Sequence, residues 1–274
     1  MADSTEKKGF LGSFLSLPND NPKKTLFVAI MLCLVCSILV STAAVSLKPL
    51  QTSNKKDDIK RNILAVTGLS DEPGSLDELF SRFEVKLVNL ETGEYADTEI
   101  DPVVYEQRKA AADPMMSVEL PGGIDIASIK RRANLAPVYL LTEGDIIKQV
   151  VLPVHGYGLW STLYGFLSLD GDFNTIEGLR FYEHAETPGL GGEVDNPKWR
   201  AQWEGKKVFD ENGNVEIRVI RGHVGPETVN AEHKVDGLSG ATLTSNGVTN
   251  LLQFWLGEHG FGPYLKNMRS ELGK

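Results

Sequence analysis

The chain has 274 residues, of which 41% are hydrophobic and 24% charged, enough for one sizeable globular domain or two small ones. Its 28 basic and 37 acidic residues give a formal net charge of −9, and the acidic excess lies entirely after residue 47. Such a charge excludes electrostatic binding to nucleic acid or to an anionic membrane surface. The expected partners are proteins or compact ligands.

An uncharged apolar run from Thr25 to Leu47 is the first feature along the chain. As an α-helix that rises about 1.5 Å per residue it reaches about 34 Å, and the apolar core of a bilayer is about 30 Å thick. The run therefore predicts a single transmembrane helix over residues 25–47, after an N-terminal tail over residues 1–24. A cleaved signal peptide is the alternative, with Ala43 and Ala44 near its cleavage site, but the run exceeds the roughly 7–15 apolar residues of such a peptide.

Basic residues flank the run on both sides, so the positive-inside rule does not orient it. Within the tail, the apolar residues of the segment 10–17 fit either a short helix lying on the membrane or a disordered segment. The flanking basic residues are Lys7, Lys8, Lys23 and Lys24 before the run, and Lys48, Lys55, Lys56, Lys60 and Arg61 after it.

Both cysteines, Cys33 and Cys36, lie inside the apolar run. At this spacing in a lipid-embedded helix we expect them to act as small hydrophobic residues rather than as a redox or metal pair. The chain after residue 47 contains no cysteine, so this part can form no disulfide, hold no iron–sulfur cluster by its own thiolates and use no cysteine nucleophile.

Residues 48–136 are predicted to form a membrane-proximal linker helix and a mixed α/β insertion. The helix covers residues 52–65, and the Pro- and Gly-containing segment 69–75 ends it. A strand over residues 84–90 follows. The less periodic stretch after it is expected to contain short helices, one of them near Ile126 to Asn134.

Residues 137–274 carry the clearest pattern, which is three consecutive hairpins followed by a helix. The first hairpin joins residues 138–141 and 146–151. The second joins residues 163–169 and 176–182, and the third joins residues 207–210 and 215–220, each across a turn rich in Gly, Asp or Asn. Hairpins in series with a helix at the end predict an α+β fold. It consists of an antiparallel sheet with flanking helices and follows the transmembrane helix along the chain.

Two connections of this sheet have sequences suited to a ligand. Residues 156–160 read Gly-Tyr-Gly-Leu-Trp, which permits close backbone approach to a planar molecule and stacking on Trp160; a tight turn with a buried Trp is an equal alternative. Residues 184–192 read His-Ala-Glu-Thr-Pro-Gly-Leu-Gly-Gly, a permissive backbone able to wrap a ring system. Its His-x-Glu pair offers only two metal ligands, so no metal is expected.

Residues 236–245 read Asp-Gly-Leu-Ser-Gly-Ala-Thr-Leu-Thr-Ser and precede apolar residues at helical spacing from Val248 to Leu256. Thr242 therefore lies at or just before a helix N-terminus, where unpaired N–H groups and the helix dipole stabilise an anion such as phosphate. Gly240 and Ala241 leave its hydroxyl uncrowded for a modifying enzyme. A Thr here is also an ordinary N-cap residue.

This segment matches Asp-x-x-Ser/Thr-Gly-Ala-Thr at every specified position and resembles the flavinylation motif of bacterial FMN-binding domains. In that motif FMN is joined through its phosphate to the final Thr, so the resemblance implies covalent FMN on Thr242. The implied neighbours of the attachment are Ser239, Gly240, Ala241, Leu243 and Thr244. The implied contacts to the ring or the ribityl chain are Trp160, Glu186, Thr187, Gly189, Leu190 and Gly191.

Taken together, the single anchor, the two Gly-rich connections and the motif resemble the C subunit of the bacterial Na⁺-translocating NADH:quinone reductase. The resemblance covers nearly the whole chain. The run Lys60-Arg61-Asn62-Ile63-Leu64 and the long segment before Val138 favour this family over the shorter G subunit of Rnf-type complexes, which shares the motif. The resemblance implies an electron-transfer subunit of a six-subunit inner-membrane complex that oxidises NADH, reduces ubiquinone and exports Na⁺.

The resemblance also implies an FMN transferase as a maturation partner, a cytoplasmic tail over residues 1–24 and a periplasmic FMN-binding domain over residues 137–274. The competing interpretation is a membrane-anchored periplasmic binding module without flavin, in which Thr242 only caps a helix. An anchored hydrolase is not expected, because no credible pair of nucleophile and base is present.

Overall fold

The computed structural model describes residues 18 and 21–273 of the chain. The predicted interfacial segment 10–17 lies outside the described residues. The chain divides into two compact units, residues 1–57 and residues 58–274, and each is considered by itself.

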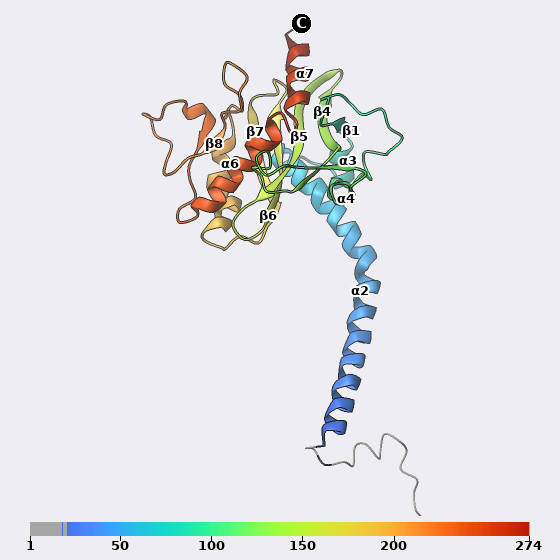
Figure 1. Ribbon diagram of the computed structural model, residues 1–274. Coiled ribbons are helices and arrows are strands. Elements are labelled where there is room, and N and C mark those ends of the chain that lie inside the picture. Colours follow the sequence, from blue (N-terminus) through green and yellow to red (C-terminus); the bar gives the residue numbers. More distant parts are fainter. Residues whose placement is uncertain (1–17, 19–20, 274) are drawn as a thin grey trace, which may run out of the picture. The chain divides into compact units, whose positions relative to one another are not determined.

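The first unit consists mainly of the long helix α2 (Pro22–Val66), whose last residues belong to the second unit (Figure 1). Pro22 is its first residue, and the side chain of Asn21 accepts a hydrogen bond from the Lys23 N–H at 3.0 Å. Its apolar part is long and apolar enough to cross a membrane. The predicted transmembrane helix and the predicted linker helix are thus one helix that runs through Pro49. A proline removes a single N–H donor from the ladder, which a long helix tolerates.

The second unit is built on a five-stranded sheet in the order β1-β4-β5-β6-β7, with every neighbouring pair antiparallel. The predicted α+β class and its antiparallel sheet are confirmed, as are the first two hairpins. The strands are β1 (Phe83–Asn89), β4 (Leu135–Glu143), β5 (Ile146–Tyr157), β6 (Thr162–Asp170) and β7 (Ile176–Glu183).

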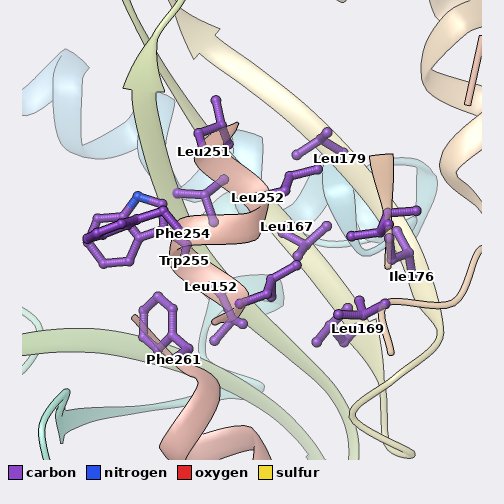
Figure 2. Packing of buried hydrophobic residues seen from close by; sticks show 14 of the residues in the cluster. Leu152, Leu167, Leu169, Ile176, Leu179, Leu251, Leu252, Phe254, Trp255 and Phe261 are labelled. Carbon is purple, nitrogen blue, oxygen red and sulfur yellow. The ribbon is translucent and has the colours of Figure 1, made fainter. Parts of the chain in front are cut away.

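One face of this sheet packs against α6 (Thr242–Leu256), the helix that the apolar spacing predicted. Figure 2 shows leucines of β5, β6 and β7 pointing at side chains of α6, with Phe261 beside them. The pattern residues Val248, Leu251, Leu252 and Trp255 are all 0% exposed. A last helix, α7 (Gly262–Leu272), was not predicted. Its buried residues are Tyr264 and Leu265.

The other face of the sheet carries a smaller core. The end of α2 contributes Ile63, Leu64 and Val66 to it, and these pack with Phe83 of β1 and Phe166 of β6. Helix α3 (Leu76–Phe80) adds Leu79 to this core and begins with a capping box between Ser75 and Glu78. The sheet is therefore covered on both faces.

Short elements complete the second unit and surround the sheet. The helices are α4 (Gln107–Ala112) and α5 (Pro197–Arg200), with 3₁₀ turns at Leu69–Asp71, Gly191–Asp195, Ala201–Trp203 and Ala231–His233. The strands are the antiparallel pair β2 (Ser117–Glu119) and β3 (Arg131–Ala133), and the parallel pair β8 (Arg218–Val219) and β9 (Lys234–Val235).

The predicted helix near Ile126 to Asn134 is wrong. The carboxylate of Asp125 accepts hydrogen bonds from the N–H groups of Ile129 (2.9 Å) and Lys130 (2.7 Å). Ser128 and Lys130 take positive φ values of 54° and 66°, so this segment is a tight turn that leads into β3. A side-chain acceptor has here displaced the helical hydrogen bonds.

The third predicted hairpin is also largely wrong. One bridge, Phe209 to Val215, is present at its turn. The Val208 carbonyl also accepts hydrogen bonds from the N–H groups of Glu216 (2.9 Å) and Ile217 (3.2 Å). The rest pairs elsewhere: the Val208 N–H donates to the Asn174 carbonyl at 2.9 Å, and residues 218–219 form the parallel strand β8 with β9. These partners are distant in sequence, so local turn signals did not indicate them.

Candidate functional site

The motif threonine is the first residue of α6, and the N-cap residue is Ala241. Ala241 has no side-chain oxygen, and no side chain of the described residues caps this helix. Thr242 is exposed, so its hydroxyl is accessible and is not used as a cap. The simple capping interpretation of Thr242 is therefore wrong, and the first N–H groups of α6 remain available to an anion.

The turn before the helix is held from inside by its buried residues. The Ser245 hydroxyl accepts a hydrogen bond from the Leu238 N–H at 3.0 Å, and the Ala241 N–H donates to the Leu238 carbonyl at 3.1 Å. Gly240 has a φ of +70°, a conformation that favours glycine. Ser239 and Gly240 stay exposed beside Thr242.

Asp236, at the start of the motif, is bonded within the protein. Its carboxylate accepts hydrogen bonds from the His223 ring at 2.8 Å and from the Val224 N–H at 2.7 Å. Burial opposes its ionisation, but these bonds outweigh burial and hold the pKa of Asp236 below its usual value. Trp199 donates to its carbonyl at 2.8 Å. Asp236 thus holds the start of the turn over residues 236–241.

The loop that follows β7 displays some of the predicted residues and buries others. Thr187, Gly189 and Leu190 are exposed, with Leu190 43% exposed. A Cβ added to Gly240 would lie 3.0 Å from Leu190, so this leucine borders the turn that precedes Thr242. The loop keeps its shape because the Thr187 carbonyl accepts hydrogen bonds from the N–H groups of Leu190 (3.1 Å) and Gly192 (2.9 Å).

Glu186 lies at the inner side of this loop and is only 5% exposed. Its carboxylate accepts hydrogen bonds from the N–H groups of Leu159 (3.0 Å), Trp160 (2.9 Å) and Ser161 (3.3 Å), and from the Thr244 hydroxyl (2.7 Å). Burial disfavours the charged form, but these donors outweigh it and hold the pKa of Glu186 below its usual value. Both oxygens are therefore used inside the protein.

The tip between β5 and β6 presents its aromatic residue outward. Trp160 is 65% exposed, which excludes the alternative of a tight turn around a buried Trp. Leu159 beside it is 37% exposed, and Leu243 on the first turn of α6 is 58% exposed. We call these four exposed residues the apolar rim: Leu159, Trp160, Leu190 and Leu243. The sequence had indicated Trp160 and Leu190 as site residues, but not Leu159.

The three segments of the site approach each other through glycines. A Cβ at Gly247 of α6 would lie 2.5 Å from the Tyr157 carbonyl, and one at Gly158 would lie 2.7 Å from the Glu186 carboxylate. Neither position therefore tolerates a side chain without movement. Gly247 was not singled out in the sequence, although a glycine inside a helix is a signal of close packing.

The structure gives no metal site in this region. The two ring nitrogens of His184 are used by the Asp195 carboxylate at 2.9 Å and the Glu186 N–H at 3.2 Å. Across the described residues, no three His, Cys, Asp or Glu side chains gather to hold an ion. Three cavities of about 360, 370 and 450 Å³ are lined by residues other than those of the apolar rim and Thr242.

Residues 158–257 match the family model of the FMN-binding domain, a range that begins at the β5–β6 tip and includes Thr242. The fold and the site thus place the chain among proteins with an FMN-binding domain. Its relatives include the C subunit of the Na⁺-translocating NADH-quinone reductase from Pseudomonas aeruginosa, 52% identical over 91% of this chain and 97% of that protein. The corresponding protein of Vibrio anguillarum is 51% identical over 92% of this chain and 96% of that protein.

Solved structures show the same relationship. The crystal structure of NqrC from Shewanella oneidensis superposes with a TM-score of 0.73 at 35% identity, covering 80% of this chain and 99% of that one. The C subunit from Parabacteroides distasonis gives a TM-score of 0.59 at 30% identity, covering 80% and 96%. The chain belongs to the NqrC family, the C subunits of the Na⁺-translocating NADH-quinone reductase, which confirms the resemblance seen in the sequence.

Proposed function

We propose that this chain is an electron-transfer subunit of a Na⁺-translocating NADH:quinone reductase and carries FMN bound covalently through a phosphoester to Thr242. The observation that carries the proposal is the position of Thr242: an exposed hydroxyl at the first residue of a helix that no side chain caps. That hydroxyl belongs to a complete flavinylation motif over residues 236–242, within an FMN-binding domain.

The residues present fit an FMN phosphate at this place. The phosphodiester keeps a negative charge, and the free N–H groups and dipole of α6 favour an anion there without a basic side chain. The apolar rim offers Trp160 and Leu190 as surface for a flat ring. Because these side chains are exposed, a ring held by them would be accessible to the redox group of a neighbouring protein.

The chain's own residues have three tasks in this mechanism. FMN, when bound, supplies the redox chemistry. The Thr242 oxygen holds its phosphate, the apolar rim orients its ring, and Glu186 with Asp236 fixes the loops that carry them. A bound FMN would supply electron transfer between partner proteins, for which the exposed apolar rim offers accessible surface rather than a substrate pocket. The partners are the other five subunits of the reductase and, during maturation, an FMN transferase.

The direct test of covalent attachment is the colour of the full-length protein after co-expression with an FMN transferase. The phosphoester survives denaturation, so the protein band should fluoresce as a flavin after electrophoresis in denaturant. A G-type subunit of an Rnf complex would also fluoresce, but the family relationship favours the NqrC assignment. A flavin-free band would favour the membrane-anchored binding module.

We also propose that α2 anchors the chain once in the bacterial inner membrane, with the tail cytoplasmic and residues 48–274 periplasmic. Protease added to intact spheroplasts should then degrade the domain and leave a membrane-bound fragment that contains residues 25–47. A cytoplasmic protein of the same cells serves as the control for membrane integrity. Degradation only after the membrane is opened would reverse the proposed orientation.

The apolar rim is expected to tune the flavin without being needed for its attachment. Replacing Trp160 or Leu190 with Ala should leave in-gel flavin fluorescence intact, because both side chains are exposed and the phosphoester forms on the Thr242 hydroxyl alone. The visible spectrum and the midpoint potential should shift, by about 30 mV for each tenfold change in relative affinity for the oxidised and reduced flavin. Spectra and potentials equal to those of the unmodified protein in both variants would place the ring elsewhere.

A further inference from the structure

Glu186 differs from the other acidic residues of the site because it is buried without a cation. Buried carboxylates in proteins are usually paired with Lys or Arg. No ion pair of the described residues includes Glu186, and its charge is met by four hydrogen-bond donors alone. Removing the Glu186 carboxylate from water is costly. Three of the four donors that compensate for this cost are backbone N–H groups of one exposed tip.

The four donors come from the two segments that carry the proposed flavin site. One carboxylate oxygen, Oε1, receives the N–H groups of residues 159–161, which include Trp160. The other oxygen, Oε2, receives the hydroxyl of Thr244, which is 0% exposed and lies two residues after Thr242 in the first turn of α6. The side chain of Glu186 therefore joins the tip that holds Trp160 to the helix end that holds the attachment residue.

The backbone is shaped around this carboxylate. A Cβ at Gly191 would lie 2.6 Å from both Glu186 Oε2 and Thr244 Oγ1, and a Cβ at Gly158 would lie 2.7 Å from Glu186 Oε1. The tip at Gly158 and the Glu186 loop at Gly191 therefore come this close to the carboxylate only because neither position has a side chain. A second tie, from the Ala185 N–H to the Ser161 hydroxyl at 2.7 Å, holds the other end of the tip. The tip has few other fixed contacts, since Leu159 and Trp160 are exposed.

We infer that Glu186 is a positioning residue of the flavin site, whose carboxylate clamps the β5–β6 tip to the first turn of α6 and so fixes Trp160 relative to Thr242. This rests on the proposed attachment of FMN at Thr242. The Glu186 carboxylate is buried and both of its oxygens accept hydrogen bonds within the protein, so it acts through Trp160 and Thr244. Without the clamp, the N–H groups of residues 159–161 form hydrogen bonds with water instead and the tip becomes mobile, while the Thr242 hydroxyl stays accessible.

The test uses the full-length protein in detergent, prepared with and without a co-expressed FMN transferase, and four variants. Glu186→Ala removes the clamp, Glu186→Gln keeps its shape without charge, and Thr244→Val removes only the bond to α6. Glu193→Gln is the matched control, because this carboxylate lies in the same loop but bonds only the Asn196 side chain. The measurements are amide hydrogen exchange of residues 158–161, in-gel flavin fluorescence, and the visible spectrum and midpoint potential.

In Glu186→Ala we expect exchange at residues 159–161 to speed up on the order of tenfold or more, because their N–H groups lose hydrogen bonds to a charged acceptor. Flavin stays attached, but its spectrum and potential shift. Glu186→Gln restores part of the protection, Thr244→Val shifts the spectrum in the same direction, and Glu193→Gln changes nothing. If Glu186→Ala does not fold, Thr244→Val and Glu186→Gln decide the matter.

Unchanged exchange and an unchanged flavin spectrum in the Glu186 and Thr244 variants would overturn the clamp. A wild-type protein without attached flavin would instead overturn the proposed function. Exchange of the flavin-free protein would then still decide whether Glu186 holds the tip, so the two failures are distinguishable.

Discussion

A Thr242→Val variant is expected to carry no covalent flavin at all. Valine keeps the shape of threonine but has no hydroxyl to form the phosphoester, and the side chain is exposed, so folding should not change. The measurement is in-gel flavin fluorescence of the full-length protein after co-expression with an FMN transferase. Loss of fluorescence should be complete rather than partial.

Two variants control this result. Thr242→Ser keeps a hydroxyl at the same place and should remain fluorescent. Thr98→Val removes an exposed hydroxyl far along the chain, one that binds only the Ile100 N–H, and should be as bright as the unmodified protein. Fluorescence that persists in Thr242→Val would mean that another residue carries the flavin.

A Trp255→Ala variant is expected to lose about 3–5 kcal/mol of unfolding free energy, the usual cost of truncating a buried Trp. Trp255 is 0% exposed within the core between α6 and the sheet, and its indole N–H donates to the His155 carbonyl at 2.6 Å. The truncation leaves both a cavity and an unpaired buried carbonyl. Denaturant unfolding of the full-length protein in detergent, followed by near-ultraviolet circular dichroism, measures the loss.

Trp160→Ala is the matched control, because it removes the same side chain from a position that is 65% exposed. Its cost should stay within about 0.5 kcal/mol, as for most surface substitutions. Equal losses in the two variants would contradict the assignment of Trp255 to the core and Trp160 to the surface.

The elements that the sequence predicted well are those decided by local periodicity. Helix α6 follows from apolar residues at helical spacing that all face the sheet, and the hairpins of β4 to β7 follow from β-rich runs around short polar turns. In the hairpins the partner strand is also a neighbour in sequence, whereas α6 shows its apolar face by periodicity alone and packs on strands distant in sequence. Local preference and tertiary packing therefore agree.

The elements that were predicted wrongly depend on a hydrogen-bond partner that the local sequence pattern does not indicate. The turn after Asp125 exists because one carboxylate takes the N–H groups of Ile129 and Lys130, where the sequence indicated a helix. Strand β8 pairs in parallel with β9 rather than with the strand expected before it. A local side-chain acceptor overrode the helical pattern in the first place, and a tertiary pairing overrode the hairpin pattern in the second.

In the site, too, the residues of a continuous motif were predicted from the sequence, whereas contacts between distant residues were not. Thr242 was predicted as the attachment residue from the consecutive residues of the motif over residues 236–242. Glu186 was expected to contact the cofactor, yet its carboxylate bonds to Thr244, which is 58 residues away in sequence. No pattern in one chain reveals such a pair, and only the fold brings the two side chains together.

The most direct test of covalent FMN at Thr242 is tandem mass spectrometry of the peptide that contains residues 236–245. The protein is co-expressed with an FMN transferase, purified at full length and digested. We predict that this peptide carries the mass of one FMN phosphoester, with fragment ions that assign it to Thr242. An unmodified Thr242 in a protein that still holds covalent flavin would contradict the account.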